Sequence, residues 1–177
     1  MIESLWTEVI TNGAFYWHLL VEHIEITMIA VVFSVIVGMG IGIAIADRPK
    51  IARVVISIVN ALCTIPAIAL LGVLISITGI GNTTAIIALI LYALLPIVRG
   101  TTVGIMSIDP KVIEAAVAMG SRPCQTLLKI KLPLAMPILF ASLRNMVTMT
   151  IALAGIASFV GAGGAWGRDL SWDYHQQ

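Results

Sequence analysis

Few side chains in this sequence could carry out acid–base or covalent chemistry, and they form no catalytic set. Glu114 could act as a general acid, but no histidine or carboxylate is spaced along the chain to act with it. Cys63 lies in an apolar segment and Cys124 in a polar one, so we expect neither a disulfide nor a metal site from them. His18 and His23, on a polar segment, favour solvated side chains over metal ligands. The sequence therefore predicts a chain that is not an enzyme.

A nucleotide site is also missing from the sequence. No glycine-rich loop is followed by lysine and then serine or threonine, the pattern whose backbone N–H groups cradle phosphates. The basic side chains are spread over several loops and the net charge is +1, which excludes a basic nucleic-acid surface. We expect no cofactor and no metal in this chain.

The composition predicts a membrane protein. The chain has 177 residues, of which 59% are hydrophobic and 11% are charged, and its mean hydropathy is +1.05. Soluble domains carry about a quarter charged residues, because much of their surface must face water. The predicted fold class is therefore all-α, a polytopic bundle of transmembrane helices.

Four apolar segments are long enough to cross a bilayer as helices, which takes about 20 residues. They lie at about 26–46, 54–77, 83–103 and 134–160. Pro66 would kink the second of these spans and Pro96 the third. In the first span, Gly38, Gly40 and Gly42 would let another helix approach closely.

The basic residues predict how these spans are oriented. Three lie in the turn at 47–53 and four in the stretch 107–133, whereas residues 1–23 and 78–82 contain none. Positively charged loops stay on the cytoplasmic side, so we expect the N-terminus outside and residues 107–133 inside. Residues 1–23 would form an external interfacial segment, with aromatic rings at headgroup depth, and residues 24–160 would form the transmembrane domain.

Residues 107–133 are the one long stretch that resembles a water-facing helical hairpin. Asp109 can cap a helix, and Pro110 suits the first helical position. Gly120 would end this helix, because glycine adopts the left-handed conformation of a helix C-terminus at little cost. Ser121 would then cap a second, short helix.

The hairpin predicts contact with another protein. Small residues at Ala115, Ala116 and Gly120 would allow close backbone approach, and the carboxylate of Glu114 would supply an orienting ion pair. Pro133 would bend the chain before the fourth span. A plain cytoplasmic loop is the alternative that the composition leaves open.

The spacing within the hairpin is specific. It reads Glu-Ala-Ala, three residues, Gly, nine residues, Ile, one residue and Leu-Pro, over positions 114–133. In this pattern the chain resembles the membrane subunits of bacterial ABC importers, whose coupling loop is seated in a cleft of the ATP-hydrolysing subunit. The resemblance implies a set of residues that contact this ATPase: Glu114, Ala115, Ala116 and Gly120. It implies a second set that fixes the loop to the fourth span: Ile130, Leu132 and Pro133.

A narrower resemblance covers most of residues 18–164. The strings CTIPAIALL (63–71), GIGNT (79–83), LYALLPIVR (91–99) and SFVGAGG (158–164) look like the permeases of osmoprotectant importers. That family imports glycine betaine, carnitine, choline and related quaternary amines. The resemblance implies three partners: an extracytoplasmic substrate-binding protein, an ATP-binding cassette ATPase that binds the ATP, and a second permease subunit, identical or similar.

From this resemblance we expect a permease subunit of an ATP-driven osmoprotectant importer in the bacterial plasma membrane. One alternative is a permease for another small solute, such as an amino acid or a sulfonate. Another is a self-contained secondary carrier or channel, although the lack of Asp and Glu within the spans disfavours ion coupling. A non-functional truncated fragment is the third.

The candidates for the translocation path lie in the second span. They are Asn60, Thr64 and Pro66, with helix packing and a kink as the alternative explanation for each. Arg144 has two explanations as well. Either its helix projects into the cytoplasm before entering the bilayer, which keeps the charge at the interface, or it faces the path.

The tail at 161–177 departs from the family, which continues past the glycine-rich turn into a further span. We expect the tail to result from a change of reading frame near residue 165, in the gene or in its sequencing, with at least one C-terminal span missing as a consequence. Reading the coding DNA through and past this point tests the prediction. A permease-like apolar continuation in a shifted frame would support it, and a clean frame without one would contradict it.

Overall fold

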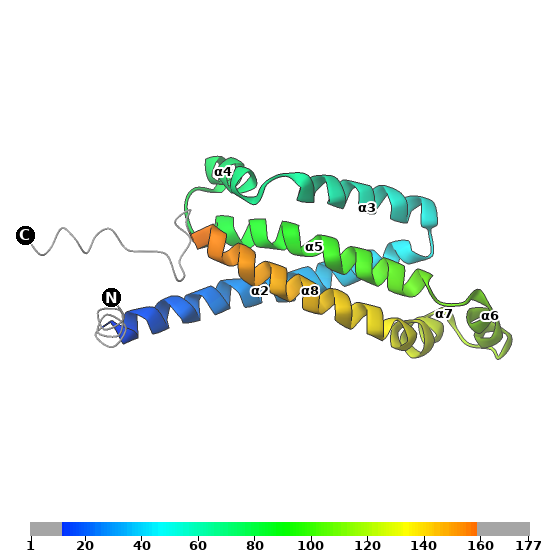
Figure 1. The fold of residues 1–177 in the computed structure, drawn as a ribbon. Coiled ribbons are helices and arrows are strands. Elements are labelled where there is room, and N and C mark those ends of the chain that lie inside the picture. Colours follow the sequence, from blue (N-terminus) through cyan, green and yellow to red (C-terminus); the bar gives the residue numbers. More distant parts are fainter. Residues whose placement is uncertain (1–11, 159–177) are drawn as a thin grey trace, which may run out of the picture. The chain divides into compact units, whose positions relative to one another are not determined.

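The computed structural model describes residues 12–158, and their regular structure is helical, with no strand in that range. Figure 1 shows the helices in chain order. They are α2 (Gly13–Ala46), α3 (Pro49–Thr64), α4 (Ala67–Thr78), α5 (Asn82–Met106), α6 (Pro110–Ala118), α7 (Pro123–Thr126), the π-helical turn η1 (Leu127–Lys131) and α8 (Leu132–Ser158). The predicted all-α class is confirmed. The predicted tail at 161–177 and residues 1–11 of the predicted external segment lie outside the described residues.

Within the described range, 3 helical segments are long and apolar enough to cross a bilayer. They are α2, α5 and the 35-residue run Pro123–Ala157, which joins α7, η1 and α8. The broken pair of α3 and α4 makes a fourth crossing if it counts as one span. This count agrees with the four predicted spans and describes a multi-pass membrane protein.

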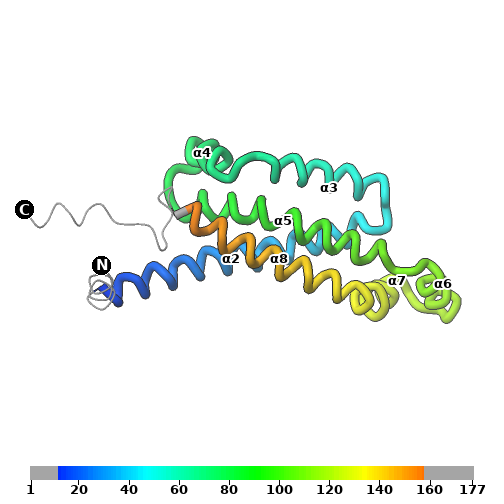
Figure 2. The backbone as a smooth tube through the Cα atoms, in the orientation of Figure 1, coloured from blue at the N-terminus to red at the C-terminus, as the bar shows by residue number. Residues whose placement is uncertain are grey.

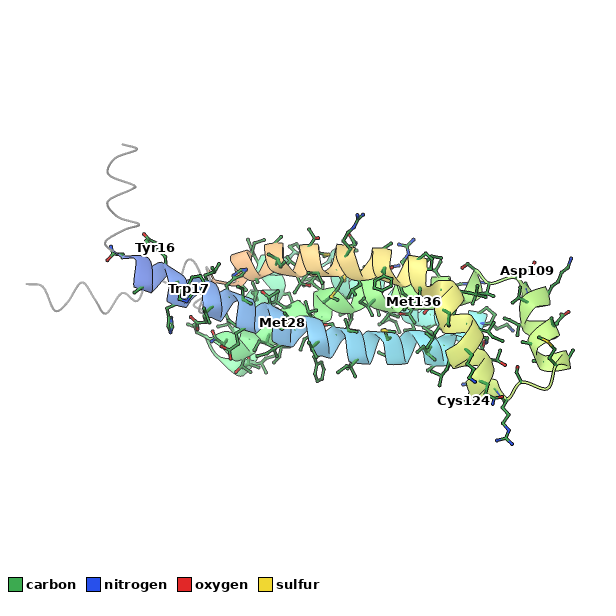
Figure 3. All side chains as sticks on the ribbon, turned by 90° about the horizontal axis from the view of Figure 1, so that it is seen from below. Tyr16, Trp17, Met28, Asp109, Cys124 and Met136 are labelled. Atoms are coloured by element: carbon green, nitrogen blue, oxygen red, sulfur yellow. The ribbon has the colours of Figure 1, made fainter. Side chains whose placement is uncertain are left out.

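Helix α2 begins well before the predicted first span. It starts at Gly13 and therefore includes Glu22 and Glu25, which the charge-free segment 26–46 left out. Glu22 is half-buried and Glu25 is exposed. In the first turns, the rings of Phe15 and Tyr16 pack edge to face with centroids 5.7 Å apart. Figure 3 shows Tyr16 and Trp17 near the start of this helix.

The second predicted span is two helices and not one kinked helix. Ile65 and Pro66 adopt extended backbone conformations, with ψ of 126° and 136°, between the end of α3 and the start of α4. A proline lacks the N–H of the helical ladder and pushes the preceding residue out of the helical region, so the helix ends completely. The freed carbonyl of Ile65 accepts a hydrogen bond from the hydroxyl of Tyr92. Pro96, in contrast, lies inside the continuous helix α5.

The described residues belong to two compact units. The first contains the part of α2 up to Ala30, residues Pro66–Leu89 and the end of α8 from Ile151 onward. The second contains Val31–Ile65 and Ile90–Thr150. The second unit therefore holds the whole predicted hairpin together with the helices that carry it.

Hydrogen bonds near the α4–α5 turn organise the first unit. The side-chain amide of Asn82 donates to a carboxylate oxygen of Glu22 at 3.0 Å, which joins the start of α5 to α2. The hydroxyls of Thr78 and Thr84 lie 2.6 Å apart and join the end of α4 to α5. Thr84 also contacts the carbonyl of Gly79, which has a φ of 82° in the turn.

In the second unit, α2 and α5 approach closely at two glycines. A Cβ built on Gly38 would lie 2.7 Å from Ile97, and one built on Gly42 would lie 2.5 Å from Thr101. Residues four apart lie on the same face of a helix, which explains why these two glycines share the contact. Gly40 points elsewhere, with nothing within 4 Å, so the prediction of close approach is right for Gly38 and Gly42 and wrong for Gly40.

Small side chains also bring α5 and α8 together. The Cβ of Ala135 lies 3.3 Å from the position that a Cβ on Gly104 would occupy, and Gly100 packs directly against Ser142. Fully buried Met146 extends the contact with Ala93 and Ile97 into a hydrophobic cluster. Helix α5 is therefore the element against which both α2 and α8 pack in this unit.

We predict that Gly42→Val destabilises the second unit, because the new side chain would collide with Thr101 on α5. Overpacking of this kind costs about 1–3 kcal/mol. Gly40→Val is the matched control, since it adds the same side chain to the same helix in open space. Thermal unfolding of the two purified variants in detergent checks the prediction. Equal midpoints for Gly42→Val and Gly40→Val would contradict the observed packing.

Candidate functional site

The predicted hairpin begins with a capped helix. The carboxylate of Asp109 accepts a hydrogen bond from the backbone N–H of Lys111 at 2.9 Å, and Pro110 occupies the first helical position of α6. Both features satisfy the N-terminus of a short helix without help from other elements. The two predictions for Asp109 and Pro110 are confirmed.

The end of α6 is closed by Gly120. Its N–H donates to the carbonyl of Val117 at 2.9 Å, and the N–H of Ser121 donates to the carbonyl of Ala116 at 3.1 Å. This pair of bonds is the Schellman arrangement, which requires a left-handed residue after the helix. Gly120 supplies it with a φ of 83°. The prediction that Gly120 ends the helix is confirmed.

The second short helix starts one residue later than predicted. The capping position of α7 is Arg122 and not Ser121, because Pro123 takes the first helical position. The backbone N–H of Arg122 donates to the side-chain oxygen of Gln125 at 3.0 Å. The Ser121 hydroxyl instead lies 2.7 Å from that of Thr126 and ties the loop to the end of α7.

A widened helical turn connects α7 to α8. In η1 the N–H of Leu132 donates to the carbonyl of Leu127, five residues earlier. Pro133 follows directly, inside the first turn of α8. A proline crowds the carbonyl four residues before it, here that of Lys129, and a π turn at this place lets the helix continue. Where the sequence predicted a bend at Pro133, the structure has a π turn and a continuous run of helical residues.

Figure 2 shows α6 and α7 beyond the ends of α5 and α8 within the second unit. Figure 3 places Asp109 at the start of α6 and Cys124 in α7, in the same region. Helices α6 and α7 of the hairpin thus lie at the end of the helices that carry them.

The predicted coupling residues differ in how far they reach the surface. Glu114, Ala115 and Gly120 are exposed, whereas Ala116 is only 2% exposed and packs inside the chain. Of the second set, Ile130 and Leu132 are half-buried and Pro133 is exposed. Two apolar side chains that sequence reasoning did not single out, Val117 and Met119, are 59% and 82% exposed at the end of α6. In the sequence, the apolar character of these two residues within a polar stretch was the feature that could have identified them as contact residues.

A cavity of about 380 Å³ lies beside α6. Its wall includes Pro110, Ile113 and Glu114 from the hairpin, and Asp47 and Lys131 from outside α6. The ammonium of Lys131 lies 2.6 Å from a carboxylate oxygen of Asp47. The basic side chains around both residues predicted cytoplasmic loops, but the sequence gave no indication that Asp47 and Lys131 form an ion pair.

The three candidates for the translocation path are exposed in the structure. Asn60 and Thr64 lie four residues apart on α3 and therefore share one face of that helix. The Thr64 hydroxyl donates to the carbonyl of Ala61 at 2.7 Å, so it is satisfied within its own helix. Pro66 lies at the helix break described above. Their role in a path stays a prediction.

Helices α5 and α8 border a larger groove of about 620 Å³ in the second unit. Its polar side chains are Arg99 from α5 and Ser142 and Asn145 from α8, among mainly apolar neighbours. Arg144 on α8 is exposed and does not line this groove. Within residues 12–158, no group of three or more His, Cys, Asp or Glu side chains is placed to hold a metal ion.

Comparison with known proteins connects this geometry to a transport family. The model of the family described as "Binding-protein-dependent transport system inner membrane component" matches residues 34–174, which include the hairpin. Membership in this family implies an ATP-hydrolysing partner and a substrate-binding protein.

Curated relatives of the same type align with most of the chain. The carnitine transport permease protein OpuCD of Listeria monocytogenes is 39% identical over 154 residues, covering 87% of this chain and 69% of that protein. In Bacillus subtilis, the glycine betaine/carnitine/choline transport system permease protein OpuCD is 38% identical and covers 93% and 72%. The choline transport system permease protein OpuBD of the same organism is also 38% identical, covering 93% and 73%.

A solved structure supports the same fold. A chain of the MetNI methionine ABC transporter, in an inward-facing conformation, superimposes with a TM-score of 0.75 at 28% identity. The match covers 91% of this chain and 80% of that one. On the family match and these relatives, the chain belongs to the inner-membrane permease components of binding-protein-dependent ABC importers.

Proposed function

We propose that this chain is the permease subunit of an ATP-driven importer for osmoprotectants such as glycine betaine, carnitine or choline. The ATP would be bound and hydrolysed by a partner ATPase, so that this chain itself needs no cofactor. A substrate-binding protein would deliver the solute, and a second permease subunit would complete the path. The solute class rests on relatives whose names specify carnitine, choline and glycine betaine.

The hairpin is the observation that carries the coupling part of this proposal. It combines a helix capped at both ends with an exposed carboxylate at Glu114 and exposed apolar side chains at Val117 and Met119. A self-capped helix keeps its shape when it is pushed from outside, which a coupling element requires. In this arrangement Glu114, Ala115 and Gly120 would contact the ATPase, and buried Ala116 would hold the helix against its neighbours.

The second coupling set would act at the base of the hairpin. Ile130 belongs to η1, and Leu132 and Pro133 open α8. Because these residues continue directly into a membrane-crossing helix, a displacement of the hairpin would reach α8 through them. The hairpin would lie in the cytoplasm and the start of α2 outside the cell, in the orientation that the basic loops predict.

We expect Glu114→Lys to abolish recovery of the ATPase with the permease. Reversing the charge at a desolvated contact costs about 2–5 kcal/mol, which lowers the amount of complex by at least about tenfold. The measurement is copurification of the ATPase with the tagged chain from membranes. Glu25→Lys, the same change in the N-terminal half of α2 and outside the unit that holds the hairpin, should leave the ATPase bound.

Gly120 provides an independent test of the same contact. Gly120→Trp should also remove the ATPase, whereas Gly120→Asn should keep it, since asparagine tolerates the left-handed backbone better than other residues. If the ATPase stays bound to both Glu114→Lys and Gly120→Trp while solute uptake continues, the proposed coupling role is wrong.

The solute class is tested by uptake into liposomes that contain the chain with its ATPase and binding protein. We expect ATP-dependent uptake of at least one of glycine betaine, carnitine and choline, with methionine and taurine as comparison solutes. Uptake of methionine or taurine alone would identify a permease for another solute. Uptake without ATP and without the ATPase would instead identify a self-contained carrier.

A further inference from the structure

An ion pair joins two parts of the second unit that are far apart in the sequence. The ammonium of Lys131, at the end of η1, lies 2.6 Å from the carboxylate of Asp47, in the short turn between α2 and α3. The two residues are 84 positions apart along the chain. This Asp47–Lys131 bridge is the only salt bridge among residues 12–158.

The environment of Lys131 makes the bridge more than an incidental surface contact. The side chain of Lys131 is only 12% exposed, whereas that of Asp47 is 75% exposed. Because most of the Lys131 side chain is covered by protein, a carboxylate partner compensates for part of the hydration that its ammonium loses. Lys129, two residues earlier in the same turn, is exposed and has no such partner in the described structure.

The bridge lies beside the packed ends of three membrane-crossing helices. Ala46 at the end of α2, Ile105 near the end of α5 and Ala135 in the first turn of α8 form one buried cluster. Leu127 of η1 packs against this cluster. The Asp47–Lys131 bridge therefore adds a polar connection at the edge of an apolar one, where η1 meets the turn that starts α3.

The hairpin has few other routes into the membrane helices. Three residues connect α5 to α6 in the chain, and on the other side η1 leads from α7 into α8. The cavity beside α6 is lined by both partners of the bridge and by Glu114. A movement of α6 and α7 would consequently reach Lys131 before it reaches the middle of any span.

We propose that Asp47 and Lys131 are positioning residues that transmit movement of the coupling hairpin to α2 and α3. This inference rests on the proposed function, since it needs an ATPase to move the hairpin. In this mechanism η1 carries the displacement to Lys131, and the bridge pulls on the α2–α3 turn. Helix α3, which carries the exposed Asn60 and Thr64, would then move together with α8.

The test uses the complete transporter, with its ATPase and binding protein, in liposomes. Three quantities are measured: the amount of assembled complex, ATP hydrolysis as phosphate released, and ATP-dependent uptake of labelled glycine betaine, carnitine and choline. For Asp47→Asn and for Lys131→Met we expect normal assembly and continued ATP hydrolysis. Uptake per ATP hydrolysed should fall about fivefold or more, which is the factor that corresponds to the lower end of typical coupling free energies between sites.

Two further variants separate transmission from a merely structural role. The exchange Asp47→Lys with Lys131→Asp restores the ion pair with reversed charges, and it should recover most of the uptake per ATP. Lys129→Met removes a neighbouring charge from the same turn and should behave like the wild type.

Each outcome decides between the two proposals. Unchanged uptake per ATP in both single variants, or a fall that the exchanged pair does not recover, would overturn the bridge as a transmitting contact while leaving the proposed function intact. Failure of the single variants to assemble, with assembly restored by the exchange, would likewise overturn transmission in favour of a structural role. A wild-type chain that binds no ATPase would overturn the proposed function, and the bridge proposal with it.

Discussion

The absence of water in the bilayer core determines how the polar groups of this fold are arranged. Backbone N–H and C=O groups must find partners within the protein there, which is why the apolar segments are helices. Three buried hydroxyl groups in the helices follow the same constraint: Thr27, Thr102 and Thr150 each donate to a carbonyl four residues earlier. Within residues 12–158, the one broken span is interrupted at Ile65 and Pro66, and the Tyr92 hydroxyl donates a hydrogen bond to the freed carbonyl of Ile65. Tyr92 is therefore part of what makes the break possible.

The lipid environment also explains why small residues lie at the helix contacts. Lipid tails are as apolar as leucine, so helices in a membrane gain little from burying large aliphatic side chains against one another. Close backbone contact and van der Waals packing take over that role, and the glycines of α2 and α5 provide it at Gly38, Gly42 and Gly100. Large apolar side chains on α2 stay on the outside in consequence, among them Met28, Phe33 and Ile36.

Sequence patterns predicted the elements of the fold well where one physical signal dominates. Lack of charge located the spans, and the residue types at Asp109, Pro110 and Gly120 located both ends of α6, because caps are local interactions.

Prediction failed where the outcome depends on a neighbouring element. The charge-free criterion missed the first turns of α2, since Glu22 is accommodated by Asn82 on another helix. Pro66 was expected to kink a helix, but its effect depends on whether a distant side chain can satisfy the exposed carbonyl. The Asp47–Lys131 pair joins residues that no local pattern connects, so the sequence alone could not reveal it.

The left-handed backbone at Gly120 limits how this position can change during evolution. A glycine codon reaches alanine, valine, serine, cysteine, tryptophan, arginine, aspartate or glutamate by one nucleotide substitution. Of the residue types that tolerate such a backbone relatively well, which are asparagine, aspartate and histidine, only aspartate is in that set. A single-step replacement that keeps the turn would therefore place a second negative charge six residues after Glu114, just beyond the end of α6. Exchange of Gly120 for asparagine needs two nucleotide substitutions. The genetic code therefore restricts this position in addition to the left-handed backbone.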